Sequence, residues 1–138
     1  MEGAGRDWPV YHGDPGGTHY STLRRIDRGN VHRLAPAWVY RCDDARERPA
    51  TTIECNPLVR GGVLYLTTPG LKVVALDGET GAERWRFDPW DGRRAGGVNR
   101  GLACWEEGAH RRLFYAAGTF LYALDAADPS AGVKVVEQ

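Results

Sequence analysis

The sequence has no excess of charge of either sign. Its 138 residues carry 18 Lys and Arg against 18 Asp and Glu, so the formal net charge is zero. Nucleic-acid binding and attraction to an anionic membrane depend on clustered positive charge, and the composition favours neither partner. No apolar run reaches the ~20 residues that span a bilayer. Residues 1–6 lack an apolar secretory core, so the chain as written is expected to stay in the cytoplasm.

Cysteine, histidine and methionine are sparse. The three cysteines are odd in number and have no C-x-x-C spacing, which argues against a zinc site and allows at most one disulfide. We expect small, buried, unpaired residues at Cys42, Cys55 and Cys104. The four histidines show neither H-x-x-x-H nor H-E-x-x-H spacing, so none receives a catalytic or metal-binding role. One Met against five Trp and 18 Gly favours short strands and turns over helices.

The stretch 51–89 is the clearest structural signal. Apolar residues alternate with their neighbours at Val63 and Tyr65, as in a half-buried strand. The pair Gly61–Gly62 precedes this strand and suits a turn with positive φ. The stretch therefore predicts strands separated by tight turns, within one domain of ordinary size.

The same pattern returns further along the chain. Ala75-Leu76-Asp77 recurs as Ala123-Leu124-Asp125, and Val63-Leu64-Tyr65 aligns with Leu113-Phe114-Tyr115. A recurrence of this size, built of strands, is typical of propeller blades. We predict an all-β fold, a partial β-propeller of about two four-stranded antiparallel blades over residues 51–138. The ring would be incomplete, and its open edges would need the remaining blades or a second chain as partner.

Residues 1–50 are predicted to be an N-terminal segment with one strand. The strand is expected at Ala37–Tyr40, and a short helical turn between Leu23 and Leu34, capped by Asp27 or Asn30. The glycines at 13–17 lack the Lys-Ser/Thr of a phosphate-binding loop. Nearer the C-terminus we expect a hairpin-like loop over residues 106–112.

Several separated motifs, in one order, resemble a known family. They are Trp8, Tyr11-His12-Gly13-Asp14, Gly16 to Leu23, Ile26, Asn30-Val31, Leu34, Ala37-Trp38, Ile53 to Val59, the Ala-Leu-Asp…Thr-Gly…Trp unit and Asn99-Arg100-Gly101. Together they resemble the N-terminal portion of the quinoprotein alcohol and glucose dehydrogenases, which depend on pyrroloquinoline quinone (PQQ). The resemblance implies an eight-bladed propeller with PQQ near its axis and a bound calcium ion.

The resemblance also implies two cofactor-binding residues, Glu54 and Arg100. PQQ is a tricarboxylate with an ortho-quinone, and a planar guanidinium such as that of Arg100 presents paired donors to such oxygens. Taken alone, an arginine in a turn is more often a solvated surface group, and a strand carboxylate often lies at a rim. Trp85 and Trp105 are expected to be packing groups. The family's catalytic aspartate and calcium ligands lie in later blades, so no catalytic or metal-binding residue is assigned.

The predicted function is that of an N-terminal fragment of a PQQ-dependent dehydrogenase. The intact enzyme would oxidise a sugar or alcohol by hydride transfer to PQQ, and the fragment alone is expected to be inactive. The family's alcohol branch carries adjacent cysteines where this chain has Arg94-Ala95, which favours the sugar branch. The family is periplasmic, unlike the expectation from residues 1–6. The alternatives are a non-enzymatic scaffold or binding module and a decayed remnant.

Overall fold

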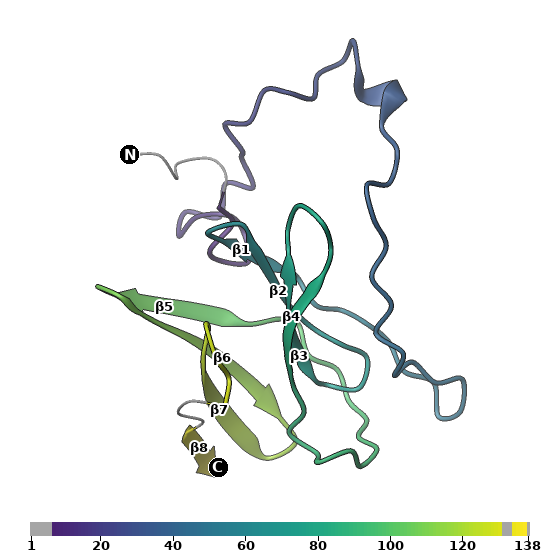
Figure 1. Ribbon diagram of the computed structural model, residues 1–138, viewed down its shortest axis with the longest axis vertical. Helices are drawn as coiled ribbons and strands as arrows, with labels where there is room; N and C mark the ends of the chain where they lie inside the picture. Colours follow the sequence, from purple (N-terminus) through teal and green to yellow (C-terminus); the bar gives the residue numbers. More distant parts are fainter. Residues whose placement is uncertain (1–6, 131–133, 138) are drawn as a thin grey trace.

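The computed structural model describes residues 7–130 and 134–137 and shows an all-β architecture (Figure 1). It contains eight strands and one short 3-10 helix. The expectation for residues 1–6 lies outside the described residues. The strands are β1 Leu58–Arg60, β2 Val63–Thr67, β3 Val73–Asp77, β4 Glu83–Phe87, β5 Ala103–Glu107, β6 His110–Ala117, β7 Phe120–Asp125 and β8 Lys134–Glu137.

The strands form two four-stranded antiparallel sheets, which confirms the predicted fold class. Their orders are β1-β2-β3-β4 and β5-β6-β7-β8, so each sheet is a simple meander. Tight turns join neighbouring strands. Gly61 and Gly62 have φ of 58° and 76°, values that a residue with a Cβ adopts only at a cost. Gly108 at the β5–β6 turn has φ of 59°.

The turn after β3 explains the Asp…Thr-Gly part of the repeat unit. A side-chain oxygen of Asp77 accepts hydrogen bonds from the backbone N–H of Glu79 at 3.1 Å and of Thr80 at 3.0 Å. The guanidinium of Arg84 donates to the other oxygen at 2.7 Å, and these donors hold the pKa of Asp77 well below its usual range. Gly81 has φ of 73°, and a Cβ there would lie 2.5 Å from the indole of Trp38.

The main core lies between the two sheets. Its buried side chains come from one face of each sheet: Leu58, Val63, Tyr65, Val73, Ala75, Leu113, Tyr115, Ala117, Tyr122 and Leu124, joined by Leu71, Leu102 and Ala126. Tyr115 and Tyr122 stack with ring centroids 5.2 Å apart, and Phe87 from the first sheet meets Tyr122 edge-on at 5.5 Å. Burial of apolar area on this scale is the main stabilising term for such a fold.

The strand registers correct the predicted alignment of the two repeats by one residue. Leu64 pairs with Leu76 in the first sheet, and Leu113 pairs with Leu124 in the second. Leu64 therefore corresponds to Leu113, whereas the sequence alignment paired it with Phe114. The error arises because the β2–β3 and β6–β7 connections differ in length. A slip of one residue matters because it moves every side chain to the opposite face.

With the corrected register, the two sheets present equivalent faces in the same direction. The face of the first sheet that carries Tyr65 and Ala75 packs against the second sheet. The equivalent face of the second sheet carries Phe114 and Ala123, and Trp105 on the same face is 45% exposed. This outer face also carries Arg112 and Asp125, which form an ion pair. Trp105 belongs to neither of the buried clusters formed by the described residues.

The N-terminal segment covers the opposite face of the first sheet. There Leu66, Val74 and Leu76 form a second cluster, and Trp38 and Tyr40 pack against it. The predicted strand at Ala37–Tyr40 is wrong, because these residues form no ladder and only Trp38 and Tyr40 contact the sheet, through their side chains. Trp8 alone joins the sheet edge, through an antiparallel bridge to Val59.

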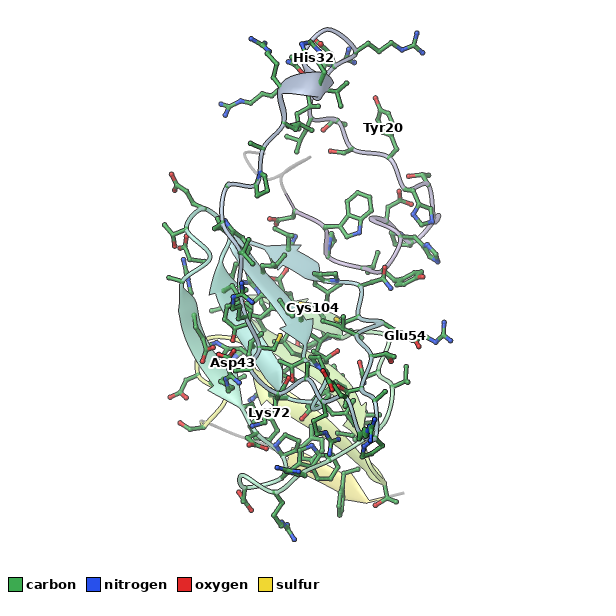
Figure 2. The ribbon with its side chains drawn as sticks, turned by 90° about the vertical axis from the view of Figure 1, so that its right-hand side faces the viewer. Tyr20, His32, Asp43, Glu54, Lys72 and Cys104 are labelled. Atoms are coloured by element: carbon green, nitrogen blue, oxygen red, sulfur yellow. The ribbon has the colours of Figure 1, made fainter. Side chains whose placement is uncertain are left out.

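Between these contacts the chain makes a long excursion away from the sheets (Figures 1 and 2). The predicted helical turn is a single 3-10 turn, Val31–Arg33, and Asn30 precedes it without a side-chain capping bond. Tyr20, Leu23 and Leu34 are largely exposed on this excursion. No helix in the described ranges is long and apolar enough to cross a membrane.

The predicted hairpin over residues 106–112 is present, but its turn is shorter than expected, because β5 continues to Glu107 and β6 begins at His110. Five register pairs, from Ala103↔Phe114 to Glu107↔His110, extend β5 and β6 almost to the turn, although the pairs nearest the turn are polar or charged. An ion-pair network stabilises the extension. Arg60 donates to Glu106 through Nε at 2.6 Å and to Asp7 through Nη1 at 3.0 Å, and Arg111 also binds Glu106. The network links the N-terminal segment to both sheets.

This network predicts a pH dependence of stability. The hydrogen bond from Arg60 lowers the pKa of Glu106, so its folded pKa lies below its unfolded value. Its stabilising contribution is present above the unfolded pKa and is lost as the pH falls through the folded value, below about pH 5. Glu106→Gln should therefore cost about 1 to 3 kcal/mol at pH 7 and flatten the acid limb in urea unfolding. The neighbour Glu107→Gln is the control, and equal acid limbs in both variants would contradict the assignment.

Candidate functional site

Glu54 and Arg100 lie together at one end of the two sheets. Each belongs to the connection that leads into the first strand of a sheet, Glu54 before β1 and Arg100 before β5. The Nη2 atom of Arg100 lies 3.6 Å from an Oε atom of Glu54. Their side chains are 82% and 40% exposed, so both face solvent, and Glu54 projects at the margin of the sheets in Figure 2. The structure thus brings together the two residues that the resemblance singled out.

A parallel bridge between the two connections sets this proximity. Asn56 pairs with Gly101, and the backbone N–H of Asn56 donates to the carbonyl of Arg100 at 3.0 Å. Gly101 has φ of 133°, and a Cβ at this position would lie 2.9 Å from the carbonyl oxygen of Asn56. The glycine of the Asn-Arg-Gly motif is therefore required by close backbone approach.

The exposed pair has donors and acceptors suited to a polar, anionic ligand. The weak ion pair at 3.6 Å leaves most of the Arg100 guanidinium open to solvent. A guanidinium can hold a carboxylate through two parallel hydrogen bonds and stays charged at any working pH. Arg100 can therefore bind a carboxylate ligand, whereas the Glu54 carboxylate can only accept hydrogen bonds. Among the described residues no three His, Cys, Asp or Glu side chains are grouped to hold a metal ion.

Arg94 and Ala95 lie in the loop that connects the two sheets. Together with residues 43–46, Gly70 and Lys72, this loop lines a groove of about 300 Å³. The guanidinium of Arg46 donates a hydrogen bond to the carbonyl of Ala95. This bond links the segment 43–46 to the loop on the other side of the groove. The three cysteines of the chain are free and partly buried, less enclosed than the sequence suggested.

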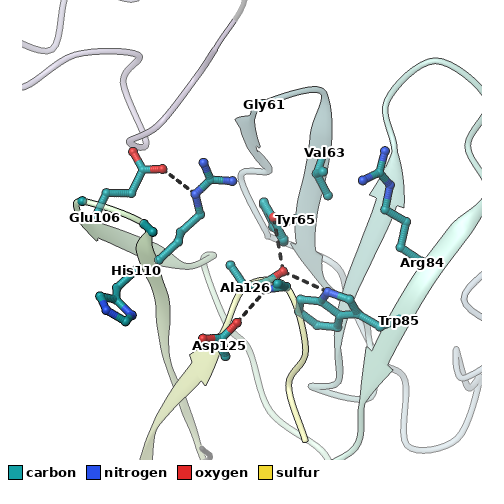
Figure 3. Close-up of a pocket in the computed structure, with 13 residues that line it drawn as sticks. Gly61, Val63, Tyr65, Arg84, Trp85, Glu106, His110, Asp125 and Ala126 are labelled. Atoms are coloured by element: carbon teal, nitrogen blue, oxygen red, sulfur yellow. Dashed lines mark hydrogen bonds and ion pairs between the residues drawn. The ribbon is translucent and has the colours of Figure 1, made fainter. Parts of the chain in front are cut away.

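A cavity of about 560 Å³ lies away from Glu54 and Arg100 (Figure 3). It is lined by the β1–β2 turn at Gly61 and the β5–β6 turn at Gly108, whereas Glu54 and Arg100 precede the opposite ends of those hairpins. Trp85 contributes one wall, and its Nε1–H donates to the carbonyl of Ala126 at 3.0 Å. This contact ties the two sheets together and agrees with the packing role predicted for Trp85.

Two polar contacts, one at the site and one in the N-terminal segment, were not predicted from the sequence. The side chain of Asn99 contacts strands of both sheets, and His12 and His19 form a 2.6 Å hydrogen bond within the N-terminal segment. The Asn-Arg-Gly motif could have pointed to Asn99, since asparagine often bonds to the backbone two residues on. The histidine contact depends on the left-handed backbone of His19, with φ of 54°, for which the sequence carries no signal.

Comparison with known proteins identifies the class. A family model described as glucose/ethanol/alcohol dehydrogenase, beta-propeller domain, matches residues 8–131. The quinoprotein glucose dehydrogenase of Escherichia coli is 38% identical over 89 residues, 62% of this chain and 11% of that protein. The dehydrogenase subunit of the alcohol dehydrogenase (quinone) of Gluconobacter oxydans is 36% identical over 129 residues, 87% of this chain and 16% of that protein.

A comparison with solved structures gives the same class of protein. The quinohemoprotein alcohol dehydrogenase ADHIIG of Pseudomonas putida HK5 superposes with a TM-score of 0.76 at 30% identity, covering 95% of this chain and 19% of that one. The chain belongs to the PQQ-dependent glucose/ethanol/alcohol dehydrogenase β-propeller family. It spans only a small part of the length of the relatives that it matches. The resemblance seen in the sequence is confirmed, and so is the partial propeller.

The backbone at Gly101 yields a second prediction. Gly101→Ala combines an unfavourable φ with a clash against Asn56, whereas Gly108→Ala meets only an unfavourable φ, with no atom within 4 Å of the new Cβ. We expect a loss of about 2 to 4 kcal/mol for Gly101→Ala and about 1 kcal/mol for Gly108→Ala. Chemical denaturation measures both. Equal losses would show that the bridge to Asn56 does not constrain this position.

Proposed function

We propose that this chain forms the first wall of the PQQ site of a dehydrogenase that oxidises a sugar or an alcohol. The proposal rests on one observation. Glu54 and Arg100, from the connections that lead into two separate sheets, lie within 3.6 Å of each other, and both side chains face solvent. Family membership and the names of the relatives support the cofactor class. The chain covers only 11% to 19% of the length of the three relatives named above. The activity would therefore belong to a larger assembly.

Within that assembly the two residues would bind and orient the cofactor. Arg100 would donate paired hydrogen bonds to a carboxylate or quinone oxygen, and Glu54 would accept from a polar edge of the same ring system. PQQ itself supplies the redox chemistry, accepting the hydride that the substrate alcohol carbon loses. The ion pair between Glu54 and Arg100 would keep the guanidinium turned toward the cofactor before it binds.

The remaining parts of the site would come from further blades. The outer face of the second sheet is equivalent, by strand register, to the face of the first sheet that packs against the second sheet. A third blade would therefore pack on this outer face. The calcium ion of the family and its catalytic aspartate would lie in that additional part. Arg94-Ala95, in place of adjacent cysteines, favours a sugar substrate, and membership of a periplasmic family favours a periplasmic location.

Arg100 provides the direct test. Titration of the purified chain with PQQ, followed by tryptophan fluorescence and by the melting temperature, should show binding by the wild-type chain. Arg100→Ala should weaken it by about tenfold or more, since a hydrogen bond to a charged group contributes about 1.5 to 3 kcal/mol. Arg24→Ala, a change at an exposed arginine of the N-terminal excursion, serves as the control. A chain that folds but is indifferent to PQQ would instead favour the non-enzymatic scaffold.

The open face of the second sheet gives a separate prediction about partners. Trp105 should promote association of the isolated chain, because burying a large apolar side chain contributes about 1.5 to 3 kcal/mol. Trp105→Glu is therefore expected to lower the association constant by about tenfold or more without lowering the melting temperature. Sedimentation velocity over a range of concentrations measures the effect. Tyr20→Glu, at a comparably exposed aromatic, is the control, and an unchanged mass for Trp105→Glu would contradict the role of this face.

A further inference from the structure

The carboxamide of Asn99 makes three hydrogen bonds. Its Oδ1 accepts from the backbone N–H of Gly101 at 2.7 Å and from the hydroxyl of Thr67 at 3.3 Å, and its Nδ2 donates to the carbonyl of Ala116 at 2.8 Å. The N–H of Gly101 can only donate and the carbonyl of Ala116 can only accept. The opposite orientation of the amide would lose both bonds, so the orientation of Asn99 is determined by its partners.

Thr67, the last residue of β2, is 1% exposed and contacts both connections that carry the site. Its backbone N–H donates to the Sγ of Cys55 at 3.1 Å, and Cys55 directly follows Glu54. Its hydroxyl donates to Asn99, which directly precedes Arg100. One buried residue of the first sheet therefore bonds to the neighbour of each proposed cofactor contact.

Hydrogen bonds fix the backbone around Arg100, whereas its side chain makes few contacts. Asn99 on one side is bonded to β2 and β6, and Gly101 on the other side is bridged to Asn56. The carbonyl of Arg100 itself accepts from Asn56. By contrast, the guanidinium is 82% exposed and makes a single ion pair at 3.6 Å. The bonds of the neighbouring residues thus fix the backbone from which the Arg100 side chain extends toward Glu54.

We propose that Thr67 and Asn99 form a positioning pair that places Arg100 beside Glu54 by joining the two sheets at the site. The proposal rests on the proposed function in that Arg100 is the group being positioned for PQQ. A ligand held by Arg100 would, through the same bonds, favour the docked arrangement of the two sheets.

The proposal is tested in the 138-residue chain without and with PQQ. The variants are Asn99→Ala, which removes all three bonds, and Thr67→Val, which removes only the hydroxyl at nearly constant shape. Asn30→Ala is the matched control, because Asn30 makes side-chain bonds to Asp27 and Arg25 in the N-terminal excursion. The first readout, without PQQ, is amide hydrogen exchange measured by NMR. The second readout is PQQ affinity in the presence and in the absence of Arg100.

We expect the amide of Asn56, which bonds to the carbonyl of Arg100, to exchange about three to ten times faster in Asn99→Ala, and less so in Thr67→Val. Core amides at Leu66 and Val74 should keep wild-type rates, which distinguishes positioning from general stabilisation. Asn99→Ala should weaken PQQ binding by about tenfold, yet add little in an Arg100→Ala background, because the two changes act through one group.

Unchanged exchange at Asn56, or equal acceleration at Asn56 and in the core, would overturn the proposal. Additive losses of PQQ affinity from Asn99→Ala and Arg100→Ala would also overturn it, since they would show that Asn99 does not act through Arg100. Faster exchange at Asn56 alone in Asn99→Ala, together with a wild-type chain that does not respond to PQQ, would support the positioning of Arg100. It would refute only the assignment of PQQ as the ligand.

Discussion

Face-to-face packing of the two sheets is the constraint on which the rest of the structure depends. Each sheet is a meander, and a single neighbour can cover only one of its two faces. The first sheet has both faces covered, by the second sheet and by Trp38 and Tyr40. Among the described residues, the second sheet has one covered face, and Trp105, on the other face, is partly exposed. The two sheets therefore differ in how far the described chain covers them.

The same packing creates the candidate site. Stacking the sheets in equivalent orientation places the connections before β1 and β5 side by side, so that a backbone bridge joins Asn56 to Gly101. Glu54 and Arg100 meet as a consequence, although neither makes an extensive contact of its own. Their positions follow from a small polar cluster, centred on Thr67 and Asn99, that links both sheets. Neither residue lines the cavity of about 560 Å³ beside the β1–β2 and β5–β6 turns.

Much of this organisation was predictable from the chain alone. Alternation around Val63 and Tyr65, paired glycines at 61–62 and the repeated Ala-Leu-Asp triplet identified strands, turns and a blade-like repeat. Two local predictions needed correction for the same reason. Residues 37–40 look like a strand, but they only place Trp38 and Tyr40 against one. The hairpin at residues 106–112 has a shorter turn than expected, because Arg60 and Arg111 hold its strands through Glu106. In both cases tertiary partners outweighed the local pattern.

Local chemistry, then, sets where strands and turns form, since alternation and positive φ act over a few neighbouring residues. It also marks Glu54 and Arg100, through motifs whose order identifies the family. Only the folded arrangement decides the register of the two repeats, which face stays open and how Thr67 and Asn99 serve the site. These features depend on contacts between residues far apart in the chain, which form only when the sheets pack and which a local pattern does not encode.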